Sequence, residues 1–147
     1  MDDLRARYGG FTGKPQENLM YPNAFKLLLV DDTKVNLIIT SKIIGQILPN
    51  VEVLQCDNGA KALDILRTQK DISVVFLDLY MPEMDGFELA TIIKNEFLNS
   101  VKLIAALTVD NSMDGLEKSK LSGFDARISK PVTKQEIIDL LTLHKIL

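Results

Sequence analysis

The sequence predicts an α/β domain, a three-layer sandwich with helices on both faces of a parallel sheet. Two observations indicate this fold class. Short and nearly uninterrupted apolar runs, such as KLLLV at 26–30 and ISVVFL at 72–77, are typical of strands buried on both faces. Segments with helical spacing of apolar residues separate these runs, as expected for parallel strands joined by right-handed crossovers.

Five strands and five helices alternate along the predicted chain. The strands span 26–30, 51–56, 72–77, 102–107 and 126–128. The helices span 35–48, 59–69, 86–98, 112–121 and 134–144. We expect the fourth helix to be the least stable, because Gly115, Ser119 and Ser122 dilute its apolar stripe.

Polar residues at the helix starts support these boundaries. Asp57 or Asn58 is placed to cap the second helix, and Asp85 the third. Thr133 and Glu136 have the spacing of a capping box at the last helix.

The length and composition indicate one globular domain. The 147 residues, 46% of them hydrophobic, are enough for one core and too few for two sizeable domains. Residues 1–24 hold three of the eight glycines and two of the five prolines, so we expect a tail or linker there. The folded domain is predicted to span 25–147.

Charge and hydropathy exclude several classes of function. A net charge of -3 gives no broad basic field, so we expect this chain not to bind nucleic acid. No stretch approaches the ~20 apolar residues of a membrane span, and the first residues lack the apolar run of a signal peptide. The single cysteine, Cys56, is interpreted as a small buried hydrophobe. We expect a cytoplasmic protein.

Polar side chains follow four of the predicted strands. They are Asp31 and Asp32 after the first strand, Asp78 after the third, Thr108 after the fourth and Lys130 just past the fifth. Ligands of open α/β sheets bind at the carboxyl ends of the strands, so we expect these side chains to form one site. Three carboxylates repel one another unless a hard cation such as Mg²⁺ offsets their charge. Mg²⁺ leaves one carboxylate free as a nucleophile, and Asp78 fits that role. Lys130 and Thr108 fit the oxygens of a phosphoryl group.

Each of these residues also has a simpler interpretation. Asp31 or Asp32 fits a cap of the helix that begins near Lys34. Thr108 fits an ordinary strand-end hydroxyl, and Lys130 a solvated lysine. The recurrence of such residues at successive strand ends favours a functional site.

The motifs LLLVDDTKVN, VVFLDLYMPEMDGFE, LIAALT and ISKPV resemble those of response-regulator receiver domains of two-component phosphorelays. The resemblance covers about residues 25–147 and implies a flavodoxin-like, doubly wound sheet of order 2-1-3-4-5. It implies that Asp78 is the phosphoacceptor. It also implies that Asp32, Asp78 and the backbone carbonyl of Tyr80 hold Mg²⁺, with Asp31 acting directly or through water.

The resemblance extends to the residues around the acceptor. Thr108 and Lys130 are implied to bind the phosphoryl oxygens, and the bond from Lys130 to Pro131 is implied to be cis. A turn between the acceptor strand and the third helix is implied to be structural, and we assign no chemistry to its residues Met81, Pro82, Asp85 and Gly86.

Two positions depart from the usual receiver pattern. Arg127 stands where many receivers carry an aromatic switch residue, and we expect it on the surface instead. Val109 is branched where a small residue is common, so it is expected to narrow access for the phosphodonor. Tyr80 and Asp110 occupy variable positions that tune phosphoryl lifetime in this family.

The resemblance also implies the partners. The donor is a histidine phosphotransfer protein or a histidine kinase, because the only histidine, His144, lies near the C-terminus. The first helix has more apolar residues than one buried face requires, so we expect some of them to form an apolar surface where the donor docks. These residues are Ile38, Ile39, Ile43 and Ile44. Output is implied through the face of the fourth and fifth helices. Such a domain assists its own phosphorylation and dephosphorylation without being a stand-alone turnover enzyme.

Other classes of protein fit the sequence less well. A flavodoxin-like electron carrier is disfavoured, because DDTKVN is acidic where the FMN phosphate would bind. A phosphatase with an aspartyl nucleophile needs a second acid two residues later, where Tyr80 stands. We expect no output domain after the last helix, and therefore either a stand-alone regulator or the terminal receiver of a hybrid sensor histidine kinase.

Overall fold

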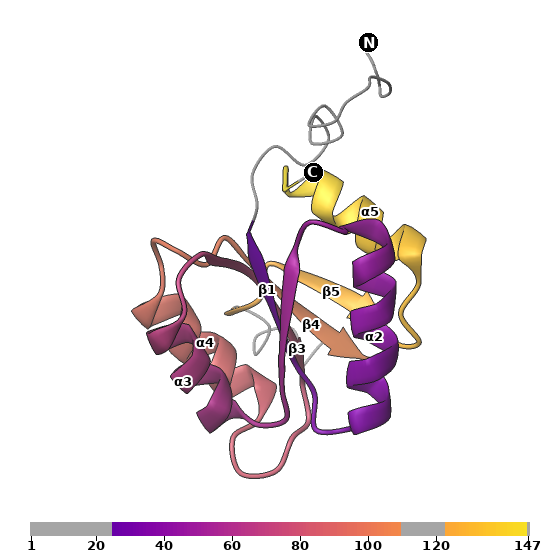
Figure 1. Cartoon of the computed structure of the whole chain (residues 1–147). Helices are drawn as coiled ribbons and strands as arrows, with labels where there is room; N and C mark the ends of the chain where they lie inside the picture. Colours follow the sequence, from indigo (N-terminus) through magenta and orange to yellow (C-terminus); the bar gives the residue numbers. More distant parts are fainter. Residues whose placement is uncertain (1–24, 110–122, 147) are drawn as a thin grey trace.

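The computed structural model describes residues 25–109 and 123–146, drawn in colour in Figure 1. The predicted tail at 1–24 and the predicted fourth helix at 112–121 lie outside the described residues. The described residues form a sheet, four helices and the turns between them.

All five predicted strands are present, and they pair in parallel in the order β2-β1-β3-β4-β5. Their bounds are β1 Lys26–Val30, β2 Glu52–Cys56, β3 Ile72–Asp78, β4 Leu103–Thr108 and β5 Ala126–Ser129. This order confirms the doubly wound sheet. The strand bounds differ from the prediction by one residue: β3, β4 and β5 run on to include Asp78, Thr108 and Ser129, and β2 and β4 begin one residue later.

Four helices cover the sheet, and they correspond to the predicted first, second, third and fifth helices. Their bounds are α2 Lys34–Ile47, α3 Gly59–Thr68, α4 Gly86–Glu96 and α5 Lys134–Leu143. Figure 1 shows α2 and α5 on one face of the sheet and α3 and α4 on the other. Within the described residues, no helix is long and apolar enough to cross a membrane.

Alternate residues of the central strands pack into two cores. On β1, Leu27 and Leu29 join the core beneath α2 and α5, while Leu28 and Val30 join the core beneath α3 and α4. Each of these four side chains is fully buried. Full burial of a side chain of this size contributes about 1.5–3 kcal/mol, which explains why the KLLLV run forms a central strand.

Three helices begin with a side-chain cap at the predicted position. The caps are Asn58 for α3, Asp85 for α4 and Thr133 for α5, which accept from the N–H three residues later at 2.9, 2.9 and 3.2 Å. The capping box of α5 is only half formed, because the Glu136 carboxylate accepts from the N–H of Ser129 at 3.1 Å. Glu136 thereby ties α5 to the end of β5, one residue before Lys130.

Candidate functional site

Three carboxylates meet where β1 and β3 end. Asp31 directly follows β1, Asp78 is the last residue of β3, and Asp32 begins the turn into α2. One oxygen from each carboxylate lies within 4.8 Å of the others. Asp31 and Asp78 are buried, with 1% and 8% of their surface exposed, whereas Asp32 is exposed. The predicted convergence of these three residues is confirmed.

The turn after β1 explains how two adjacent aspartates point to one place. The N–H of Asp31 still donates to Cys56 of β2 at 3.2 Å, so Asp31 continues the strand pairing. The chain then bends at Asp32, and Asp31 Oδ1 accepts from the N–H of Thr33 at 2.9 Å. Thr33, not an aspartate, occupies the N-cap position of α2 and makes no side-chain cap. The capping interpretation of Asp31 and Asp32 is therefore wrong.

Lys130 enters the site from the end of β5. Its Nζ lies 3.0 Å from Asp31 Oδ2 and 3.4 Å from Asp78 Oδ1, and only 14% of its side chain is exposed. The N–H of Lys130 donates to the carbonyl of Thr108 at 2.8 Å, and its bond to Pro131 is cis, as implied by the family resemblance. Lys130 is thus a partner of the buried acids, and the interpretation of Lys130 as a solvated lysine is wrong.

Burial sets the acidity of the central carboxyl. It raises the pKa of Asp78 to about 6, while the ammonium of Lys130 opposes this rise and the charge of Asp31 adds to it. A second cation would favour the ionised form of the Asp78 carboxylate still further.

The donor set fits a hard divalent cation. Asp31 Oδ2 is buried and has the Lys130 ammonium 3.0 Å away as its partner, and a carboxylate oxygen can accept a further ligand. Carboxylate oxygens are the ligands that Mg²⁺ prefers. The exposed Asp32 gives an ion access from solvent. These three residues therefore suit Mg²⁺ better than a soft metal.

Thr108 and Tyr80 lie at the same edge of the sheet. Thr108 ends β4 beside β5, where it pairs with Ser129, and only 3% of it is exposed. Tyr80 is two residues beyond Asp78, has 58% of its surface exposed, and packs edge-on against Phe87 with ring centroids 6.0 Å apart. All the predicted site residues therefore lie at the carboxyl edge of the sheet, at or just beyond the ends of β1, β3, β4 and β5.

The two departures from the usual receiver pattern are both on the surface. Arg127 is exposed on β5, as expected. Val109 follows Thr108 with 74% of its surface exposed. Whether Val109 narrows access to Asp78 stays a prediction, because an exposed side chain does not fix the route of a donor.

An apolar stripe lies on the outer face of α2. Val35, Ile38 and Ile39 are 60%, 57% and 50% exposed. Ile44, by contrast, is fully buried, and Ile43 packs against the core. The predicted apolar surface is thus present at two of the four isoleucines. Val35 was missed, although its spacing of three and four residues from Ile38 and Ile39 places it on the same stripe.

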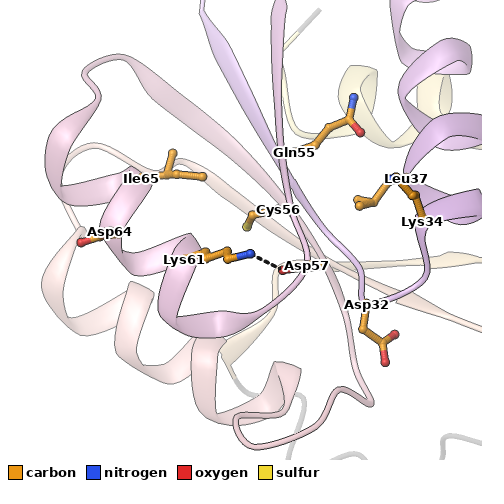
Figure 2. Close-up of a pocket in the computed structure, with 9 residues that line it drawn as sticks. All are labelled: Asp32, Lys34, Leu37, Gln55, Cys56, Asp57, Lys61, Asp64 and Ile65. Carbon is orange, nitrogen blue, oxygen red and sulfur yellow. Dashed lines mark hydrogen bonds and ion pairs between the residues drawn. The ribbon is translucent and has the colours of Figure 1, made fainter.

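Sequence reasoning also missed a groove of about 520 Å³ beside Asp32, between α2 and α3. Figure 2 shows its lining residues, which are Asp32, Lys34, Leu37, Gln55, Cys56, Asp57, Lys61, Asp64 and Ile65. Cys56 is buried, as predicted, and burial raises the pKa of its thiol to about 11. The lining comes from several separate segments, so no local motif signals the groove.

Comparison with known proteins gives consistent matches. The family model described as the response regulator receiver domain matches residues 27–142. The chain is 30% identical to stress response regulator protein 1 of Candida dubliniensis over 120 residues, which cover 80% of this chain and 42% of that protein. It is 29% identical to hybrid signal transduction histidine kinase A of Dictyostelium discoideum, covering 84% of this chain and 6% of that protein. The chain thus spans less than half the length of these curated relatives.

Among solved structures, one similar fold belongs to a complex. That structure holds the Saccharomyces cerevisiae histidine phosphotransfer signaling protein Ypd1 and the receiver domain of its downstream response regulator Ssk1. The match has a TM-score of 0.69 and 25% identity, and covers 84% of this chain and 92% of the matched chain.

Proposed function

Because the chain belongs to the response regulator receiver domain family of two-component signalling, we propose that Asp78 accepts a phosphoryl group from a phosphohistidine of a partner. One observation carries the proposal. Asp78 is a buried carboxylate at a strand end, within 3.4 Å of a lysine ammonium and beside two further acids. A buried nucleophile flanked by a fixed cation suits the transfer of a charged group.

We propose that Asp31, Asp32, Asp78 and the backbone carbonyl of Tyr80 hold Mg²⁺. Support comes from the three converging carboxylates, of which Asp31 and Asp78 are buried and Asp32 is exposed. The bound cation would neutralise the acids and polarise the oxygens of the phosphoryl group. An acidic cluster of this kind would otherwise repel an incoming phosphate.

The transfer itself uses three side chains. The Asp78 carboxylate attacks phosphorus in line, so that a P–O bond forms on Asp78 as the P–N bond of the donor histidine breaks. The Lys130 ammonium pairs with a phosphoryl oxygen and stays protonated throughout. The Thr108 hydroxyl donates to another oxygen of the product. Burial around Asp78 limits the access of water, and hydrolysis later returns the site to rest.

The donor is proposed to be a histidine phosphotransfer protein or a histidine kinase. The outer stripe of α2, formed by Val35, Ile38 and Ile39, lies on the helix that starts directly after Asp31 and Asp32, so a protein docked there reaches the acceptor. A solved relative crystallised with a histidine phosphotransfer protein supports this class of donor. The phosphoryl group, which carries about 1.5 to 2 negative charges in place of the single charge of the ionised carboxylate, would then bias the face that includes β5 and α5.

The cellular context follows from the same proposal. A cytoplasmic location suits a partner that carries phosphohistidine. Similarity to a hybrid histidine kinase favours a second possibility, namely that the chain is the terminal receiver of such a kinase and not a stand-alone regulator.

Phosphorylation by a small donor tests the proposal. We expect acetyl phosphate with Mg²⁺ to add one phosphoryl group to the purified chain, detected by intact mass spectrometry. Asp78→Asn should abolish the added mass, because its amide cannot act as the nucleophile. Undiminished labelling of that variant would refute the assignment of Asp78.

A further inference from the structure

The segment between β3 and α4, residues 79–85, carries the proposed carbonyl ligand and is fixed to the core at two points. Leu79 is fully buried and Met81 is 7% exposed, whereas Tyr80 between them points outward. Leu79 packs near Ala106, and Met81 packs in the core beneath α3 and α4. The segment therefore has little freedom to move towards the sheet.

On its other side, the segment contacts Gly86, which has no side chain. The N–H of Gly86, at the start of α4, donates to the carbonyl of Leu79 at 2.8 Å. A Cβ added to Gly86 would come closest to the carbonyl oxygen of Asp78, and would lie 2.9 Å from Leu79 Cα and 3.1 Å from the carbonyl carbon of Asp78. All three are backbone atoms, so they can yield only if the main chain of the acceptor moves.

A second glycine, Gly59, lies against Met84 near the far end of the segment. A Cβ added to Gly59, at the start of α3, would lie 2.6 Å from Sδ of Met84 and 3.1 Å from its Cγ. Met84 thus covers the first turn of α3. Because a thioether is flexible, we expect Met84 to yield more easily than the backbone of Asp78.

We propose that Gly86, and to a smaller degree Gly59, are positioning residues for the metal site. Because neither glycine has a side chain, its neighbours can pack closely against it, and this packing fixes the positions of the Asp78 carboxylate and the Tyr80 carbonyl. Mg²⁺ accepts only small departures from octahedral geometry and from ligand distances of about 2.0–2.1 Å, so a shift of a few tenths of an ångström weakens binding. This inference rests on the proposed function and changes our sequence interpretation of Gly86 as purely structural.

Three glycine-to-alanine variants test it. Gly86→Ala should weaken Mg²⁺ binding roughly tenfold or more, as found for residues that orient metal ligands, and Gly59→Ala by roughly two- to fivefold. Gly45→Ala is the matched control, since nothing lies within 4 Å of a Cβ added at this position of α2. Its Mg²⁺ affinity should equal that of the wild type. The dissociation constants are measured by calorimetry on the whole chain, well below the melting temperature of each variant.

This design separates positioning from stability. All three substitutions replace glycine by a better helix former, so a purely structural account predicts changes in melting temperature without a graded change in Mg²⁺ affinity. Equal dissociation constants for folded Gly86→Ala and Gly45→Ala would overturn the inference. If circular dichroism shows that Gly86→Ala is unfolded, the decision passes to Gly59→Ala, and an affinity equal to that of Gly45→Ala would again overturn it.

The two proposals can fail separately. If the wild type neither binds Mg²⁺ nor is labelled at Asp78, the proposed function fails and this inference falls with it. If the wild type does both and the affinity of Gly86→Ala is unchanged, only the positioning role fails.

Discussion

Asp78 and Cys56 are both buried ionisable residues that end parallel strands, and burial raises the pKa of each side chain. The pKa of Asp78 rises to about 6 and that of Cys56 to about 11. At neutral pH the carboxyl is therefore mostly ionised, while the thiol is protonated. Asp78 faces the ammonium of Lys130 at 3.4 Å, whereas the hydrogen-bond partner of Cys56 Sγ is the neutral carbonyl of Asn58 at 3.7 Å.

The comparison shows what makes a buried strand end reactive. Cys56 lines the groove of about 520 Å³, yet its surroundings hold the thiol in its unreactive form. Asp78 does not line this groove, but it lies beside the Lys130 ammonium and two further carboxylates. Counter-charge, not the size of a neighbouring cavity, therefore distinguishes the proposed acceptor from an inert buried group.

Removing the fixed cation should have the largest effect. Lys130→Met should slow labelling of Asp78 by acetyl phosphate by roughly 10²–10³-fold, because the developing charge loses its partner. Lys61→Met is the matched control, since Lys61 pairs with Asp57 at 3.1 Å beside Cys56 and is largely exposed. Rates are followed by intact mass spectrometry. Equal rates for the two variants would show that counter-charge at Asp78 is unimportant.

Thiol chemistry probes the other side of the comparison. With a pKa of about 11, Cys56 should be alkylated by iodoacetamide at pH 7.5 at least ~100-fold more slowly than glutathione. Cys56→Ala should keep the full labelling of Asp78. Rapid alkylation of the folded chain, or loss of labelling in Cys56→Ala, would remove the contrast between the two strand ends.

The pH dependence of stability should carry the signature of Asp78. Its pKa is about 6 in the folded chain and near 3.8 when unfolded, so the folded state holds the proton more tightly. Without metal, the free energy of unfolding should fall as pH rises from about 4 to 6, by about 1–2 kcal/mol after allowing for solvent access. Urea unfolding of the wild type and Asp78→Asn at pH 4.5 and 7.5 isolates this contribution. Asp78→Asn should gain stability relative to the wild type at the higher pH, and no gain would contradict the raised pKa.

The smallest effect concerns the approach of the donor. Ile38→Glu on the outer stripe of α2 should slow transfer from a histidine phosphotransfer protein roughly tenfold while sparing acetyl phosphate, since a charge is added to an apolar contact. Leu98→Glu is the control, since Leu98 is 68% exposed and lies beyond the end of α4, and it should leave both rates unchanged. An equal loss of transfer in the two variants would show that the stripe has no special part in docking.

Much of the fold and site could be predicted from sequence, because the relevant signals are local. Runs such as KLLLV can be buried on both faces only in the middle of a covered sheet, and a polar residue that ends such a run needs a partner. This reasoning brought Asp31, Asp78 and Lys130 together, although Lys130 lies 52 residues beyond Asp78.

The rest depends on tertiary packing that local patterns do not encode. Helical spacing alone could not decide that Ile44 faces the core while Ile38 faces solvent, because α5 packs against α2. The capping box predicted Glu136 to return to its own helix, but the N–H of Ser129 competes for it. The close approach of Gly86 to Asp78 likewise appears only in three dimensions.

The most direct test is to find which residue carries the phosphoryl group. Borohydride reduces an acyl phosphate on aspartate to homoserine, so treatment of the chain after labelling with acetyl phosphate marks the acceptor for peptide mass spectrometry. We predict homoserine at position 78 and at no other position, with Cys56 unmodified. Homoserine at Asp31 or Asp32, or a phosphoryl group that borohydride does not remove, would contradict the central claim that Asp78 is the acceptor.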